Sequence, residues 1–221
     1  CQILLRDSAY LQEKDVEWVN KKRAAKHEKP IEPIYTPDDA EEALRHFVGI
    51  QYNRPYRVVP GVMATFHDAG HILGSASVTL DIEEDGRKIT LGFSGDVGRK
   101  DMPIIRDPEP LTDLDALIIE STYGDREHID GSGAEEELAD LINRTVERGG
   151  KVIIPAFAVG RTQRLVYILH ELLDKKKIPE IPIYVDSPMA CNAIDVFRSH
   201  PECFDREAYF HFYNDAVDLF T

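Results

Sequence analysis

Apolar residues in the first fifty positions recur every three or four residues, which is the spacing of an amphipathic helix. The pattern predicts a helix over residues 3–27, which Pro30 and Pro33 bring to an end. A second helix is predicted to begin after Thr36, because Thr is a good N-cap, Pro37 suits the first helical position, and two acids follow in the first turn.

From residue 56 the pattern changes to the alternation that is typical of β-strands. Alternating apolar residues over 76–82, a turn at 84–86 and a return run over 89–93 predict a hairpin. The two far ends of this hairpin are expected to meet. The nearly unbroken apolar run over 114–119 predicts a buried strand.

After residue 124 the predicted elements alternate between helix and strand. The predicted helices cover residues 134–148 and 161–175, and the predicted strands cover residues 152–155 and 183–185. Regular alternation of this kind indicates a parallel α/β architecture. We therefore predict an α/β protein with a domain boundary near residue 125.

Composition places the chain among globular proteins, with 43% hydrophobic and 30% charged residues in a total of 221. No apolar run reaches 18 residues and no signal-like segment is found, so neither a membrane nor secretion is indicated. The three cysteines, Cys1, Cys191 and Cys203, form no C-x-x-C pair. Reduced thiols and a cytoplasmic location are therefore expected.

The formal net charge of −14 argues against indiscriminate binding of polyanions over the whole surface. It does not exclude nucleic acid as a partner, because an acidic enzyme can bind phosphates in a locally basic cleft, particularly beside a divalent metal ion.

Three candidate catalytic or metal-binding residues lie at the ends of predicted strands. His71 lies in FHDAGHILGS, Asp96 in FSGDVG, and Glu120 directly follows the apolar run. Taken separately, His71 is more often structural and Asp96 more often a turn residue. A carboxylate after a buried strand, however, needs a partner or solvent to offset its desolvation. An imidazole and a carboxylate that converge at a sheet edge suit a hydrolytic zinc site.

A second group of candidates lies where predicted strands give way to helices. The backbone N–H groups around Gly160 and the helix dipole favour an anion, and Arg161 can bind phosphate in bidentate fashion. The alternative is ordinary helix capping with a solvated Arg161. Ser187 is likewise either a phosphate donor or an N-cap.

The motifs together resemble those of the metallo-β-lactamase-fold nucleases with a β-CASP domain. The similar segments, in order, are AGHILGS, FSGDVGR, IIESTYG, IPAFAVGRTQ and IYVDSPMA. This family includes the nuclease subunit of the pre-mRNA cleavage and polyadenylation machinery, and bacterial and archaeal ribonucleases. The resemblance implies part of an αββα metallo-β-lactamase sandwich over residues 1–124. It also implies the N-terminal part of a parallel-sheet β-CASP domain over residues 125–221.

The resemblance also implies roles for individual residues. His71 becomes a zinc ligand, Asp96 the carboxylate that bridges two zinc ions, and Glu120 an acid that contacts a downstream His near the catalytic centre. Two such ions activate water and stabilise charge in an in-line phosphoryl displacement. Asp96 and Glu120 are then the catalytic residues. The predicted substrate-binding residues are Gly160, Arg161, Gln163 and Ser187.

Part of the family pattern is missing. Its H-x-H-x-D-H signature, which supplies four zinc ligands, is expected upstream of residue 1, and two later histidines are expected beyond this segment. We therefore expect the chain to be the middle of a longer polypeptide, with two zinc ions in the complete protein and no activity in the fragment. The expected partners are RNA, the remainder of its own polypeptide and a second copy in a homodimer, with no membrane.

Three functions remain open at this point. The first is a zinc-dependent ribonuclease in RNA processing. The second is a catalytically silent relative that serves as a scaffold in a processing complex, and the missing upstream signature would decide between these two. The third is another hydrolase of the same fold that cleaves thioesters or lactams. The β-CASP-like half argues against the third, because those hydrolases lack this insertion.

Overall fold

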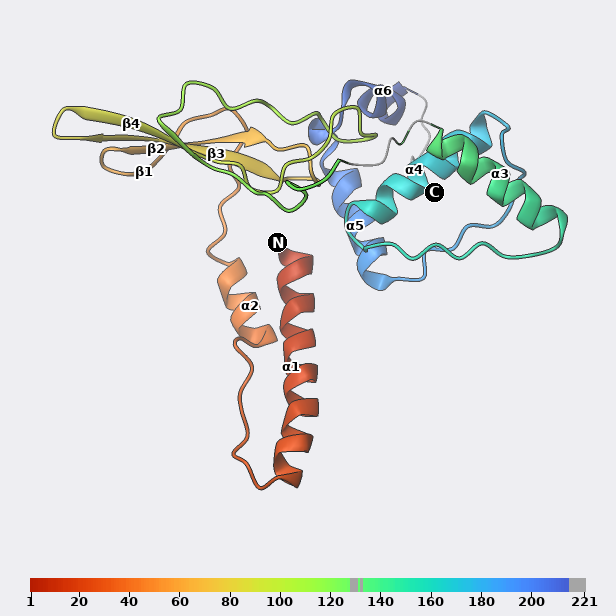
Figure 1. Ribbon diagram of the computed structural model, residues 1–221, viewed down its shortest axis with the longest axis horizontal. Helices are drawn as coiled ribbons and strands as arrows, with labels where there is room; N and C mark the ends of the chain where they lie inside the picture. The colour runs from red at the N-terminus through yellow and green to blue at the C-terminus, as the bar shows by residue number, and fades with distance from the viewer. Residues whose placement is uncertain (128–130, 132, 215–221) are drawn as a thin grey trace. The chain divides into compact units, whose positions relative to one another are not determined.

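The computed structural model describes residues 1–127, 131 and 133–214 (Figure 1). The chain divides into two compact units, residues 1–49 and residues 50–221, and each is described by itself. None of the helices in the described ranges combines the length and apolarity that crossing a bilayer requires.

The first unit is a pair of helices, α1 (Gln2–Ala25) and α2 (Pro37–Leu44). A capping box begins α2: the Thr36 hydroxyl accepts from the Asp39 N–H at 3.2 Å, and the Asp39 carboxylate accepts from the Thr36 N–H at 2.9 Å. The two helices are joined by an ion pair between Arg6 and Glu41. Both helices predicted for this part of the chain are confirmed.

The second unit contains one five-stranded sheet in sequential order. Its strands are β1 (Tyr56–Val59), β2 (Val62–Asp68), β3 (Ala76–Glu84), β4 (Arg87–Phe93) and β5 (Ala116–Ile118). Strands β1 to β4 pair with one another in antiparallel fashion, and β5 is parallel to β4. The strands β2, β4 and β5 therefore run in the same direction, and their carboxyl ends lie at one end of the sheet.

The predicted hairpin is formed by β3 and β4. Glu84 faces Arg87 at its tip, and between them Asp85 and Gly86 have φ angles of 50° and 75°. Two positive φ angles in an Asp-Gly turn produce the tight connection whose twist matches that of antiparallel strands. The hairpin prediction is thus confirmed.

The helices of the second unit pack around two hydrophobic clusters. These helices are α3 (Ala134–Glu147), α4 (Arg161–Asp174), α5 (Pro188–Ser199), the short 3₁₀ turn η1 (Pro201–Cys203) and α6 (Arg206–Asn214). One cluster centres on Ile142 and Leu172, between α3 and α4. The other joins Ile104 to Phe197 and Phe204. The helices predicted over 134–148 and 161–175 are confirmed.

The predicted strands at 152–155 and 183–185 are not strands in the structure. Both segments are irregular, and Ile153 and Tyr184 are 87% and 83% exposed. An extended segment becomes a strand only when a neighbour supplies hydrogen-bonding partners. The α/β class is confirmed, but the parallel sheet predicted for residues 125–221 is absent from their described part. The complete αββα sandwich is likewise not seen in the described residues.

The prediction of a buried strand over 114–119 is wrong in part. A strand forms at Ala116–Ile118, but Leu117 and Ile118 are 46% and 66% exposed. The reason is that β5 is an edge strand whose main contacts are with β4. A hydrophobic run predicts burial only where a second layer covers the sheet.

The predicted domain boundary near residue 125 lies inside the second unit. The cluster around Ile104 and Phe204 contains residues from both sides of this position. The boundary stays a prediction. Residues 128–130, 132 and 215–221 of the predicted second domain lie outside the described residues.

Candidate active site

The tight turn between β2 and β3 positions His71. The buried Asp68 carboxylate accepts a hydrogen bond from the Gly70 N–H at 3.0 Å. The Ser75 hydroxyl accepts from the backbone N–H groups of His71 and Ile72 at 3.1 and 3.2 Å. Burial raises the pKa of Asp68, although the Gly70 N–H acts in the opposite direction. These side-chain acceptors fix the backbone from which His71 projects.

The loop after β4 is held directly against this turn. The Gly98 N–H donates to the Ala69 carbonyl at 2.8 Å. A Cβ at Gly98 would overlap the backbone carbonyl of Gly70, so only glycine permits this approach. Gly95 has a φ of 57°, which allows the loop to turn immediately before Asp96. The close backbone approach therefore brings Asp96 to the turn that carries His71.

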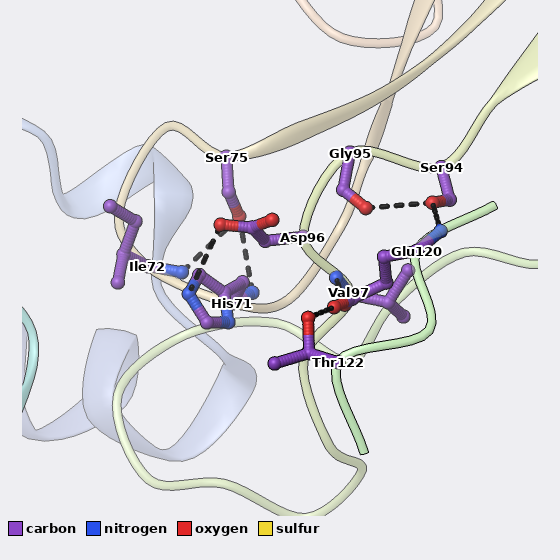
Figure 2. A network of polar contacts seen from close by, with 9 residues as sticks. All are labelled: His71, Ile72, Ser75, Ser94, Gly95, Asp96, Val97, Glu120 and Thr122. Atoms are coloured by element: carbon purple, nitrogen blue, oxygen red, sulfur yellow. Dashed lines mark hydrogen bonds and ion pairs between the residues drawn. The ribbon is translucent and has the colours of Figure 1, made fainter. Parts of the chain in front are cut away.

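His71 and Asp96 face each other at the carboxyl ends of β2 and β4 (Figure 2). The His71 Nε2 and Asp96 Oδ2 atoms are 4.0 Å apart, and the two side chains are 44% and 75% exposed. The prediction that the hairpin brings these two residues together is confirmed.

The pair fits a divalent metal ion in its chemistry. One imidazole nitrogen and one carboxylate oxygen are both ordinary zinc donors. Donor atoms about 2.1 Å from a tetrahedral ion lie about 3.4 Å apart, so the 4.0 Å pair needs only a small side-chain adjustment. Within residues 1–127, 131 and 133–214, no group of three or more His, Cys, Asp or Glu side chains has metal-binding geometry.

Glu120 lies beside this pair, just beyond the end of β5. Its carboxylate accepts from the Val97 N–H at 2.6 Å and from the Thr122 hydroxyl at 2.9 Å. The Val97 hydrogen bond lowers the pKa of Glu120 most, followed by the Thr122 hydroxyl and, more weakly, His71. Glu120 is therefore ionised at neutral pH and is bonded to the residue that follows Asp96.

Serine hydroxyls connect the loops that carry these acids. Ser94 accepts from the Glu120 N–H at 3.0 Å, and the Ser77 hydroxyl donates to the Ser94 carbonyl at 2.7 Å. The predicted site residues did not include Ser75, Ser94 or Thr122. Their position inside the matched motifs could have marked them as part of the site. A motif does not show, however, which backbone group a hydroxyl will contact.

The N-terminus of α4 lies next to the His71 turn. Gly160 has a φ of 82°, and a Cβ there would lie 2.9 Å from the Ile72 side chain. Its N–H donates to the Gln163 amide oxygen at 2.7 Å. Arg161 is exposed, with its guanidinium carbon 5.7 Å from the centre of the Phe157 ring. Gly160 thus contacts the turn that carries His71, and Arg161 is the residue that follows it.

Gln163 is fully buried, and both the oxygen and the nitrogen of its side-chain amide form hydrogen bonds within the protein. Its Nε2 donates to the carbonyls of Ala158 and Ala190 at 3.0 and 3.1 Å. In the first turn of α5, the Ala190 N–H donates to the Ser187 hydroxyl at 3.2 Å. Gln163 therefore ties the start of α4 to the start of α5, and Ser187 serves as the N-cap of α5. Substrate binding by Gln163 and Ser187 stays a prediction.

Replacing Gln163 with leucine is expected to lower the free energy of unfolding. The change leaves one N–H and two carbonyls without their partner, at a cost of about 1–3 kcal/mol for each buried group. Urea denaturation measures the loss, with the exposed Gln51→Leu as the matched control. An unchanged midpoint for Gln163→Leu would show that these hydrogen bonds do not hold the helix starts together.

Comparisons with known proteins agree with the motifs. A Beta-Casp domain profile matches residues 162–217. Ribonuclease TTHA0252 of Thermus thermophilus is 37% identical over 183 residues, which are 82% of this chain and 40% of that protein. Transcription termination factor FttA of Thermococcus kodakarensis is 37% identical over 194 residues, 84% of this chain and 29% of the relative.

An RNase J-like protein of Methanocaldococcus jannaschii is 36% identical over 172 residues, 75% of this chain and 39% of the relative. The chain thus spans well under half the length of the curated relatives it matches. The similarity extends over most of this chain, including both the His71–Asp96 region and the β-CASP segment. The family resemblance is therefore confirmed: residues 162–217 match the Beta-Casp domain, and most of the chain is similar to a segment of relatives named as ribonucleases and as a transcription termination factor.

Proposed function

We propose that the complete protein containing this chain is a zinc-dependent ribonuclease that hydrolyses phosphodiester bonds during RNA processing in the cytoplasm. The convergence of His71 and Asp96 at 4.0 Å is the main support, because it places two zinc-type donors together within a family that includes ribonucleases.

The proposed roles follow from position. His71 and Asp96 would hold metal, and bound metal would supply activated water and stabilisation of charge on the phosphate. Glu120 would act on the loop that carries Asp96, through its hydrogen bond from Val97. Near the same turn, Arg161 at the start of α4 would contact a phosphate of the RNA.

Cleavage of labelled RNA by the complete protein tests this function. We expect cleavage that a chelator stops and that added zinc restores. Zinc content without RNA cleavage would favour another hydrolase of this fold, and neither zinc nor cleavage would favour a silent scaffold. The isolated 221-residue chain is expected to be inactive. Robust metal-dependent cleavage by the fragment would contradict that expectation.

Glu120→Ala is expected to reduce the kcat of the complete protein by about 10- to 100-fold, the usual cost of removing a residue that orients a metal ligand. Glu120→Gln retains an oxygen that can accept from Val97 and should lose less. Steady-state kinetics on RNA measure both, with the exposed hairpin residue Glu84→Gln as control. Equal activity of Glu120→Ala and wild type would remove Glu120 from the mechanism.

A further inference from the structure

Three arginines lie on two separate segments, and each segment contacts the turn that carries His71. Arg161 and Arg164 are three residues apart on α4 and therefore lie on one face of the helix. Arg99 comes from the loop that follows β4. Burial lowers the pKa of the Arg164 guanidinium, and the positive charges of Arg161 and Arg99 lower it further. Arg164 also contacts Met102, which stands three residues after Arg99 on the same loop.

Among the described residues, the three cations have no carboxylate partner. None of them forms an ion pair within 4.0 Å with a described residue; Glu135 offsets the repulsion on Arg164 only weakly. The Nη1 of Arg164 lies instead 3.8 Å from the Met102 sulfur, which keeps it against the loop of Arg99. In a chain of net charge −14, a cluster of mutually repelling and unpaired arginines suits an anionic ligand.

An exposed aromatic ring extends this cluster. Phe157 is 75% exposed, and the Arg161 guanidinium lies 5.7 Å from its ring centre. Exposed aromatic rings next to arginines are platforms on which the bases of single strands stack. The arrangement therefore combines donors for phosphate with a surface for a base.

Backbone contacts fix the cluster relative to the His71 turn. Gly98, which precedes Arg99, donates to the Ala69 carbonyl, and Gly160, which precedes Arg161, packs against Ile72. Arg99 and Arg161 therefore follow two residues that both contact the turn carrying His71. A strand bound at the arginines would lie beside the His71–Asp96 pair.

We propose that Arg99, Arg161 and Arg164 form a binding site for consecutive phosphates of a single-stranded nucleic acid, with Phe157 stacking against one of its bases. The site rests on the proposed function, because it would hold the substrate of the same centre. Guanidinium groups read phosphate and not the 2′-hydroxyl, so RNA and DNA strands of one sequence should bind similarly here.

The salt dependence of oligonucleotide binding tests the arginines. The complete protein in an Asp96→Ala background, which prevents cleavage, is titrated with a fluorescent single strand at several salt concentrations. Each phosphate contact contributes about 0.7 to the slope of log K against log salt, so changing all three arginines to glutamine should flatten it by about 2. An unchanged slope and affinity would overturn the proposal.

Two controls separate charge from folding. Arg87→Gln, at the hairpin tip, removes a charge far from the cluster and should leave the slope unchanged. Changing all three arginines to lysine keeps the charges and should retain most of the slope. Loss of slope in the lysine variant equal to that in the glutamine variant would contradict a phosphate site.

The aromatic contact has its own test. Phe157→Ala should weaken binding of the oligonucleotide by at least about fivefold, and an abasic strand of equal length should bind wild type and variant alike. Equal weakening for both strands would show that Phe157 does not stack a base.

A separate assay distinguishes failure of the proposed nuclease function from failure of the arginine-site proposal. Bis(4-nitrophenyl) phosphate offers one diester and no distant phosphates, so its hydrolysis by the complete wild-type protein reports on the metal centre apart from strand binding. A complete protein that cleaves neither this diester nor RNA would refute the nuclease assignment, while the binding slopes would still decide whether the arginine site exists.

Discussion

Replacing Asp96 with alanine is expected to abolish RNA cleavage by the complete protein while leaving its fold intact. Changing a residue that only orients a metal ligand typically costs about 10- to 100-fold, so loss of a ligand itself should cost more. Folding should change little, because the Asp96 side chain is 75% exposed and exposed ion pairs contribute about 0–1 kcal/mol. Single-turnover cleavage and thermal unfolding measure the two effects.

Asp140→Ala, on the exposed surface of α3, is the matched control and should retain wild-type turnover. His71→Ala should reproduce the loss seen for Asp96→Ala, because both side chains are proposed to hold the same metal. Full turnover in either variant would remove that residue from the proposed centre.

Gly98→Ala is expected to produce the largest loss of stability among the changes considered. The new Cβ would lie 2.7 Å from the backbone nitrogen of His71 and would overlap the Gly70 carbonyl. The backbone of one of the two loops must therefore move. Changes of this kind belong to the class that costs about 3 kcal/mol or more. Because the moved loops carry His71 and Asp96, any protein that still folds should lose about 10²-fold or more in activity.

Gly131→Ala is the control, because a Cβ at Gly131 meets nothing within 4 Å. It should change the free energy of unfolding by less than about 1 kcal/mol. Denaturant unfolding and RNA cleavage of the two variants provide the comparison. Wild-type stability in Gly98→Ala would show that the loops are not in the close contact described.

The elements that could be predicted are those whose signal is local. The Asp85-Gly86 turn and the Thr36 cap depend on residues adjacent in sequence, and both formed as expected. The segments at 152–155 and 183–185 have apolar residues suited to strands, but they form no strand ladder with any other described segment. Pairing depends on distant parts of the chain, and short apolar runs do not contain that information.

In the candidate site, too, some features could be predicted from the sequence and others could not. The approach of His71 to Asp96 follows from a hairpin whose two ends must meet, so the strand pattern was sufficient to predict it. The contact of Gly98 with Gly70 and the contact of Arg164 with Met102 connect loops and helices far apart in sequence. The net charge of a chain does not reveal a local cluster of arginines, because it does not say where in the fold each charge lies.

Anomalous X-ray scattering at the zinc edge, from crystals of the complete protein, tests most directly whether His71 and Asp96 hold a common metal. We predict a peak in contact with both the His71 Nε2 and the Asp96 Oδ2, and its loss in crystals of Asp96→Ala. A wild-type protein with full occupancy of zinc elsewhere and no peak between these two atoms would contradict the account.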